Sequence, residues 1–321
     1  MGWPSLGGAS ARPAPEPNRA ETVRIEAAGS ERRGKIGKSN GNSGLKTEQM
    51  ILDWIFATPM WLWGTVLVGL STTVACCGLL IFHRLVHVDV RKAHNDLAGF
   101  TLAVVGVLYA VLLAFIAIAT WDAFSKASDI VESESDYAGG IYFDTRGLPQ
   151  AKGQPIRDAI ERYVSVVVDQ EWPLQRAGQT PDQGWQPLRD LNTAIASIQP
   201  QNLGEAMIQA ELLNSWNQLY LMRSSRLSAV QGHVPGPVWW IVFLGGLITT
   251  CYTYFFGYHN FAMHMAMTGI LAATLALVVV LIIDLDRPFR GAISVSPDPF
   301  IMTEQSWSRR FDNGYRFHEV H

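Results

Sequence analysis

Charged residues are missing from three long apolar blocks of this 321-residue chain. No Asp, Glu, Lys or Arg occurs in residues 54–82, 97–121 or 238–283. A bilayer core about 30 Å thick is crossed by about 20 apolar residues of helix, so the third block is long enough for two crossings. The pattern predicts four transmembrane helices, near residues 58–82, 97–121, 238–258 and 262–283.

The polar stretch between the second and third predicted spans also reads as helical, because its apolar residues recur at helical spacing and no alternating strand pattern appears. Two series carry this signal: Ile156, Ile160, Tyr163, Val164, Val167 and Val168, and then Leu203, Met207, Ala210, Leu213, Trp216, Tyr220 and Leu227. Gly and Pro are expected to interrupt the helices at Gly147-Leu148-Pro149, Trp172-Pro173, Gly178 to Gly184 and Gln199-Pro200. The predicted fold class is an all-α integral membrane protein, with four transmembrane helices and a helical cytosolic domain inserted between the second and third.

The second span keeps its helical character after Trp121, through Ile130 and Val131. We therefore expect one helix that continues well past the membrane. Such a helix would couple the polar domain mechanically to the bilayer segment.

Residues 1–49 are rich in Gly, Pro, Ser, Ala, Arg and Glu and show no apolar periodicity. Such a composition buries too little apolar surface to offset chain entropy. Two interpretations stand: a disordered cytoplasmic tail, or translation that begins at Met50, which we slightly favour. The predicted parts of the chain are 1–49, the first transmembrane pair 50–121, the polar helical domain 122–237, the second transmembrane pair 238–284 and a C-terminal tail 285–321.

Basic residues near the span ends predict the orientation of the chain. Both termini and the polar domain share one side, with Lys46, Lys126, Arg223, Arg226, Arg287 and Arg290, whereas the other side has Arg84, Arg91 and Lys92. We expect a multi-pass protein of the bacterial inner (plasma) membrane, with the termini and the helical domain in the cytoplasm.

Composition and motifs narrow the function classes. Only 17% of the residues are charged and the net charge is -3, and no basic face of the kind that binds nucleic acid stands out. The chain has no phosphate-binding loop, no G-x-S-x-G elbow, no H-E-x-x-H helix and no C-x-x-C pair. We therefore predict no enzyme, no catalytic residue, no cofactor and no nucleic-acid partner.

Five of the eight histidines fall at one predicted membrane face. Imidazoles that lie close together bind transition metals or sense pH, and the plainer interpretation is that histidine is tolerated at the interface. The candidates for metal binding or pH sensing are His83, His87, His94, His259 and His264.

Charged residues beside the spans offer further candidates. Asp284 and Asp286 follow the last span and form a possible ion site, with Arg287 as a competitor for the cation. Arg223 and Arg226 would attract anions or lipid headgroups, or form a solvated helix face, which we favour. The acidic residues after the second span would either influence ions at a pore mouth or form a solvated face, and these are Glu132, Glu134 and Asp136.

The second span carries the sharpest positional signal. Val104, Leu108 and Leu112 share one helix stripe at spacings of four residues, and Gly99 and Gly106 would permit close helix contact. Several copies arranged around an axis would turn this stripe into a hydrophobic constriction that gates by dewetting. The alternative is ordinary helix packing. A pore also requires a homo-oligomer, because four apolar helices offer no polar lining within one chain.

The order of several motifs resembles a family of bacterial bestrophin-like membrane proteins over roughly residues 50–300. The motifs are His94-Asn95-Asp96-Leu97-Ala98-Gly99-Phe100, the run from Val104 to Phe115 with Trp121, Glu171-Trp172-Pro173, and Asp286-Arg287-Pro288-Phe289 with Gly291. More distantly, they resemble the bestrophin anion channels, which are pentamers with four spans, a cytosolic helical domain and a hydrophobic neck on the second span. The resemblance implies that the neck falls on Val104, Leu108 and Leu112.

Arg287-Pro288-Phe289 is similar to the segment that precedes the bestrophin calcium clasp. The acidic run expected next is replaced by Ser294-Val295-Ser296-Pro297-Asp298, so calcium activation is not expected. The leading hypothesis is an oligomeric protein of the lipid bilayer that conducts or gates small ions. A non-conducting membrane scaffold whose helical domain binds a cytosolic partner is the main alternative, and a membrane enzyme that uses the interfacial histidines is a weaker one.

Overall fold

The computed structural model describes residues 58–92 and 94–316, with the side chains of 89, 90 and 308–316 left aside. All of these residues belong to one of two compact units of the chain, Ile55–His321. Within the described part every regular element is a helix and no strand occurs, which confirms the all-α prediction. The question of a tail over 1–49 or a start at Met50 lies outside the described residues.

In the part of the chain that the structure describes, four helices are long and apolar enough to cross a membrane, and they match the four predicted spans. α9 ends in a short 3-10 turn, η3 (Thr253–Phe255), and the connection between the first two spans contains α3 (Val88–Lys92). The four helices are α2 (Met60–Leu85), α4 (Asn95–Asp144), α9 (Gly236–Tyr252) and α10 (Phe261–Leu285).

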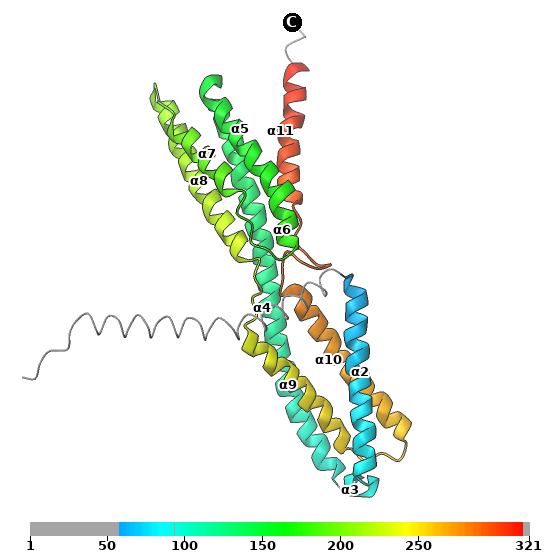
Figure 1. The fold of residues 1–321 in the computed structure, drawn as a ribbon. Helices are drawn as coiled ribbons and strands as arrows, with labels where there is room; N and C mark the ends of the chain where they lie inside the picture. Colours follow the sequence, from blue (N-terminus) through cyan, green and yellow to red (C-terminus); the bar gives the residue numbers. More distant parts are fainter. Residues whose placement is uncertain (1–57, 93, 317–321) are drawn as a thin grey trace, which may run out of the picture. The chain divides into compact units, whose positions relative to one another are not determined.

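The second span is part of one unbroken helix of 50 residues, as predicted. At 1.5 Å per residue α4 is about 75 Å long, more than twice the thickness of a bilayer core. Its first half contacts α9 and α10, and its second half contacts α5 (Gln150–Val166), α8 (Leu203–Ser228) and α11 (Asp298–Arg316) (Figure 1). One helix therefore runs through both the apolar and the polar parts of the chain.

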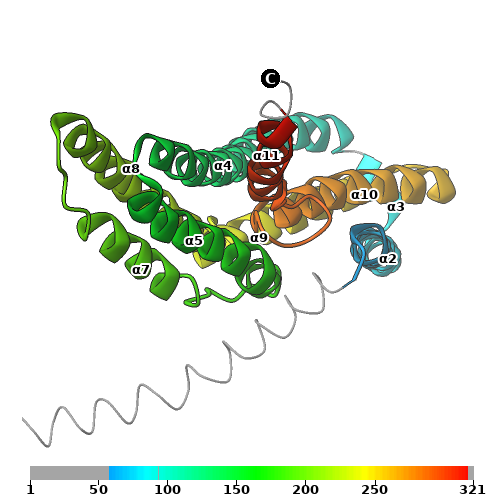
Figure 2. The ribbon, with the colours of Figure 1, turned by 90° about the horizontal axis from the view of Figure 1, so that it is seen from above.

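The helices between the second and third spans, called the inserted helices here, contact α4 mainly through α8 (Leu203–Ser228) and α5 (Gln150–Val166). Seen from above, α5, α7 and α8 are grouped beside α4 (Figure 2). In chain order they are η1 (Thr145–Gly147), α5 (Gln150–Val166), the π-helical turn η2 (Val167–Glu171), α6 (Trp172–Arg176), α7 (Trp185–Ala196) and α8 (Leu203–Ser228).

The predicted break at Trp172-Pro173 is wrong, because the helical path continues through it. Proline lacks an N–H and its ring clashes with the carbonyl four residues earlier in an α-helix. The chain avoids this conflict with the wider turn η2, in which the Trp172 N–H donates to the Val167 carbonyl. Pro173 then sits in the first turn of α6, where no N–H is required.

The predicted C-terminal tail contains a helix, α11 (Asp298–Arg316). The Trp307 ring stacks on Tyr142 of α4 with centroids 4.4 Å apart, and the Ser135 and Thr303 hydroxyls are hydrogen-bonded at 2.8 Å. Phe300 and Trp307 are buried in the core formed with the inserted helices. The C-terminal segment therefore packs against α4 and α5.

The buried face of α8 differs from the predicted apolar stripe. Leu203 and Met207 are exposed to 77% and 66%, whereas Leu212 and Leu219 are buried. Leu227 is buried as well, and the remaining buried residues are polar or charged: Glu205, Ser215, Arg223 and Arg226. The predicted stripe is thus right for Leu227 and in part for Leu213 and Trp216, and wrong at Leu203 and Met207, because a face that buries charge does not show as apolar in the sequence.

The predicted close contacts at Gly99 and Gly106 are not formed within the chain. No atom lies within 4 Å of a Cβ built on Gly106, and a Cβ on Gly99 meets only an ordinary contact. The tight approach is instead at Gly245 of α9, where a Cβ would lie 2.5 Å from Cε2 of Tyr109 in α4. The buried Tyr109 hydroxyl also donates to the Val242 carbonyl at 2.7 Å, which fixes the ring against α9.

We expect Gly245→Ala to lower the thermal unfolding midpoint in detergent, because the fixed Tyr109 ring leaves no room for the methyl group. Overpacking of this kind costs about 1–3 kcal/mol. Gly106→Ala is the matched control, because its methyl group enters open space and alanine favours the helix. Equal midpoints for the two variants would show that α9 does not depend on this contact.

Candidate functional site

The stripe predicted on α4 lies mostly on the outside of the single chain. Val104 is 46% exposed and Leu108 is 68% exposed. Leu112 is half-buried against the apolar cluster formed by Tyr109, Leu113 and neighbouring spans. The opposite face of α4 is the one that packs within the chain, so Val104 and Leu108 are available to lipid or to another copy.

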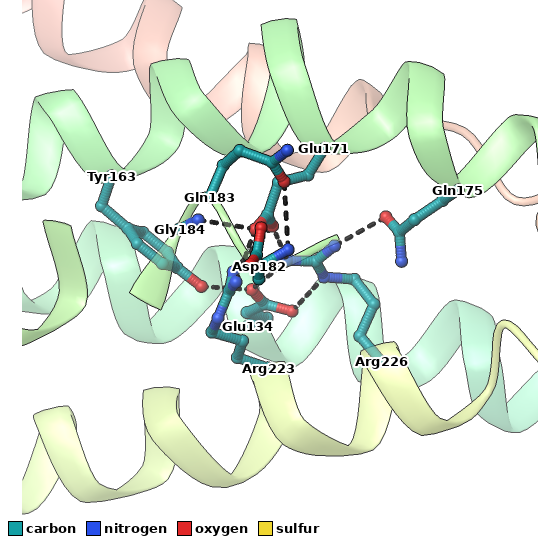
Figure 3. Close-up of polar contacts among 9 residues, drawn as sticks. All are labelled: Glu134, Tyr163, Glu171, Gln175, Asp182, Gln183, Gly184, Arg223 and Arg226. Atoms are coloured by element: carbon teal, nitrogen blue, oxygen red, sulfur yellow. Dashed lines mark hydrogen bonds and ion pairs between the residues drawn. The ribbon is translucent and has the colours of Figure 1, made fainter. Parts of the chain in front are cut away.

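A polar site that the sequence did not reveal lies among the inserted helices. Two carboxylates and two guanidinium groups meet there in the interior: Glu134 of α4, Glu171 of η2, and Arg223 and Arg226 of α8 (Figure 3). All four side chains are fully buried. We call this group the buried charge cluster.

Each carboxylate in the cluster is saturated with donors. Glu134 accepts from Arg226 Nε at 2.6 Å and from Arg226 Nη2 at 3.0 Å, and the Tyr163 hydroxyl donates to the same carboxylate. Glu171 accepts from Arg223 Nη1 and Nη2 at 2.7 and 2.5 Å and from Arg226 Nη2 at 3.0 Å. Arg226 is shared between the two carboxylates and joins them into one network.

Neutral groups complete the shell around the cluster. The Gly184 N–H donates to Glu171 at 2.7 Å, which anchors the start of α7, and Arg226 Nη1 donates to Gln175 Oε1 at 2.6 Å. The Arg223 guanidinium lies 4.7 Å from the Trp185 ring centroid. The network therefore contacts α4, α5, η2, α6, α7 and α8 at once.

Mutual pairing keeps the cluster ionised in spite of its burial. Burial alone would raise the pKa of Glu171, but the hydrogen bonds from Arg223 and the charges of Arg226 and Arg223 hold that pKa below its usual value. Burial opposes the charged form of Arg226 too, yet Glu134 raises its pKa. Burial and the Glu134 charge raise the pKa of Tyr163, so its hydroxyl stays protonated as a donor.

The solvated face that we favoured for Arg223 and Arg226 is therefore wrong, and neither alternative for the acidic residues anticipated that Glu134 is buried. Arg223, Arg226 and Glu134 are buried, whereas Glu132 and Asp136 are exposed on α4. The spacing of charges on one helix does not show whether a partner exists on another. Pairing between Glu134 and Arg226 spans 92 residues of sequence and depends on tertiary structure.

The aspartates predicted as an ion site bind different backbone donors. Asp286 Oδ1 accepts the N–H groups of His233 and Val234, both at 2.8 Å, and Asp284 Oδ2 accepts that of Ile293 at 3.1 Å. Burial raises the pKa of Asp286, although these N–H donors act in the opposite direction. The two aspartates thus join the ends of α9 and α10 to nearby loops, and an ion site there stays a prediction.

The five histidines lie near the same ends of the spans, but the contacts of three of them are with different partners. His83 Nδ1 lies 2.6 Å from Arg91 Nη2, His259 contacts the Lys92 ammonium group, and His264 Nε2 lies 2.8 Å from the Thr253 carbonyl. His87 and His94 are exposed. Among the described residues no group of three His, Cys, Asp or Glu side chains is placed to hold a metal.

Comparison with known proteins identifies the family. A model of the bestrophin-like domain matches residues 59–300, which is most of the chain and includes all four spans and the buried charge cluster. The chain belongs to the bestrophin-like family. No curated protein matches it.

Solved structures share the fold of this bestrophin-like chain. One point mutant of a bacterial bestrophin homologue from Klebsiella pneumoniae has a TM-score of 0.55 at 14% identity, over 74% of this chain and 98% of that one. A second point mutant of that homologue has a TM-score of 0.51 at 18% identity, over 76% and 96% of the two chains. The homologue solved by zinc phasing has a TM-score of 0.51 at 16% identity, with the same coverage.

We expect Arg226→Met to destabilise this bestrophin-like chain severely. The substitution leaves buried carboxylates without their shared cation, and breaking a buried ion pair costs about 3–5 kcal/mol. Thermal unfolding in detergent measures the loss. Arg162→Met is the matched control, because Arg162 is exposed on α5 and contacts only the Asp158 carbonyl; an equal loss in both variants would contradict a special role for the cluster.

Acid should weaken the cluster through Glu171. Its pKa is lower in the folded state than the ordinary 4.5, so its stabilising contribution is complete above the unfolded pKa and disappears as the pH falls through the folded pKa. We expect Glu171→Gln to be destabilised at neutral pH, and the gap in unfolding midpoint from the unmodified protein to shrink as the pH falls below about 4. A gap that stays constant with pH would show that Glu171 is not charged in the fold.

Proposed function

We propose that this chain assembles into a homo-oligomeric pore that conducts small ions across the bacterial inner membrane. The observation that carries the proposal is the outward position of the α4 stripe in a chain of the bestrophin-like family. Val104 and Leu108 are exposed in the single chain, whereas Tyr109, Leu113 and Ile116 on the other face of α4 are buried. The packed face of α4 thus leaves the predicted neck free to line an axis.

Such a pore requires several copies of the chain, because the apolar interior of one chain's described spans offers an ion little polar lining. The interior cluster of the spans contains Tyr109, Leu113, Ile116, Val242, Val279 and Ile282, which offer little to a passing ion. Copies of α4 around an axis would bring the exposed stripes together as a hydrophobic ring. A narrow ring of this kind blocks ions by dewetting and opens when it widens or wets.

The continuous α4 gives the pore a route for control. Its apolar half carries the stripe, and its polar half is clamped through Glu134 to the inserted helices. A movement of the inserted helices would therefore act on the stripe through a rigid rod. We place these helices and both termini in the cytoplasm, from the distribution of basic residues at the span ends.

A second candidate function rests on α8. Its exposed apolar side chains, at Leu203, Met207 and Leu221, are 51% to 77% exposed and are available to a partner. In that case the protein is a non-conducting scaffold whose helical domain binds a cytosolic protein. Oligomeric state in detergent and conductance in bilayers separate the two candidates.

The decisive experiment measures single-channel currents of the purified protein in planar bilayers. We expect ion currents, and we expect Leu108→Ala to increase the current or the open fraction, because a smaller side chain widens and hydrates the ring. Leu277→Ala is the matched control, since Leu277 is an exposed leucine on another span, α10. A monomeric particle without conductance would refute the pore and leave the scaffold.

A further inference from the structure

Arg91 holds a buried positive charge at one end of the spans. The residue is only 4% exposed. Its Nη1 donates to the carbonyls of Tyr254 and Phe256, both at 3.2 Å, and its Nη2 lies 2.6 Å from His83 Nδ1. These contacts hold the guanidinium against the carboxyl end of α9 and η3, where the helix dipole favours a cation.

These partners do not neutralise the charge. All three are uncharged acceptors, because His83 offers its ring nitrogen as a lone pair to the guanidinium, and Nε of Arg91 has no acceptor. Within the described side chains no carboxylate forms an ion pair with Arg91. Burial accordingly lowers the pKa of Arg91, as expected for a cation without a counter-charge.

Two further basic residues lie close to Arg91 in the sequence or at the end of the neighbouring helix. Lys92 follows directly and contacts His259, and Arg84 is exposed at the end of α2. Buried charges in proteins are normally paired, and the two fully buried arginines of the described chain, Arg223 and Arg226, both have carboxylate partners. Among the described side chains, Arg91 therefore has no carboxylate partner.

Arg91 is one of the residues that line a cavity of about 660 Å³. Its wall is mainly apolar, formed by Phe82, Val86, Leu97, Ala98, Tyr252 and Phe255. The volume lies within the range of small-molecule sites. The cavity lies where α2 ends, α4 begins and α9 ends, so Arg91 is at the ends of these predicted spans.

We propose that Arg91 and this cavity bind an anionic amphiphile, with the phosphate of an anionic phospholipid against the guanidinium and part of an acyl chain in the cavity. The anion supplies a counter-charge that no described carboxylate gives to Arg91, and the apolar wall selects a ligand with a tail over a soluble anion. The Phe82 ring, 5.9 Å from the guanidinium carbon, completes the transition from charged to apolar surface. This site does not depend on ion conduction.

The test titrates delipidated, full-length protein in detergent with short-chain phosphatidylglycerol or phosphatidylcholine and follows the thermal unfolding midpoint. We expect the anionic lipid to half-saturate the protein at a concentration at least about tenfold lower than the zwitterionic lipid, which corresponds to about 1.4 kcal/mol. Arg91→Gln should abolish this preference, because glutamine keeps a donor for the backbone carbonyls and loses the charge. Arg91→Lys should restore it in part.

Controls separate this site from general attraction to a basic surface and from a soluble anion. Arg84→Gln removes an exposed charge at the same face and should leave the preference unchanged. Glycerol phosphate, which has the headgroup and no tail, should not protect the protein at lipid concentrations. A preference that survives Arg91→Gln, or equal protection by glycerol phosphate, would overturn the proposal.

A variant that keeps Arg91 provides an independent measurement if Arg91→Gln does not fold. Ala98→Leu places a larger side chain in the apolar part of the cavity, away from the charge. We expect it to weaken binding of phosphatidylglycerol about tenfold with the unliganded unfolding midpoint little changed. Unchanged affinity in this variant would show that the cavity does not hold the tail.

Discussion

The arrangement of the polar half of this protein depends on the pairing of Glu134 and Glu171 with Arg223 and Arg226. Removing four charges from water is unfavourable by several kcal/mol for each ion. The cost is offset here because the charges sum to zero and each carboxylate receives donors at both oxygens. The helices that carry these residues are therefore constrained to one arrangement, since any other separates a charge from its partner.

The π-helical turn η2 is part of the same constraint. It supplies Glu171 as its last residue and accommodates Pro173 immediately afterwards. Turns of this type are rare and are enriched at functional positions. In this chain the turn joins α5 to α6 without a loop, so that Glu171, Trp172 and Gln175 all reach the interior.

The apolar half of the molecule follows a different rule. Its helices are exposed over most of their surface within one chain. In α2, for example, only 11% of the residues in its apolar 18-residue stretch are buried. Such helices owe their stability to lipid and to other copies more than to one another. The fixed contacts within the chain are few and specific, such as Tyr109 against Gly245 and Val242. α4 connects the apolar and polar halves, because Glu134 holds its polar half in the buried charge cluster and the apolar stripe lies in its other half.

The four spans, the helical class and the continuation of α4 past the membrane could be predicted from the sequence, because long uncharged runs and helical spacing are local properties, and the order of several motifs indicated the family. The sequence did not determine which charges are buried. Arg223 and Arg226 look like any solvated pair along the chain, and only the approach of α4 and η2 from distant sequence supplies their partners. The same reason applies to Arg91, whose acceptors at Tyr254 and Phe256 lie more than 160 positions away. Tertiary structure decided these sites, because the free energy of a charge depends on what surrounds it in space.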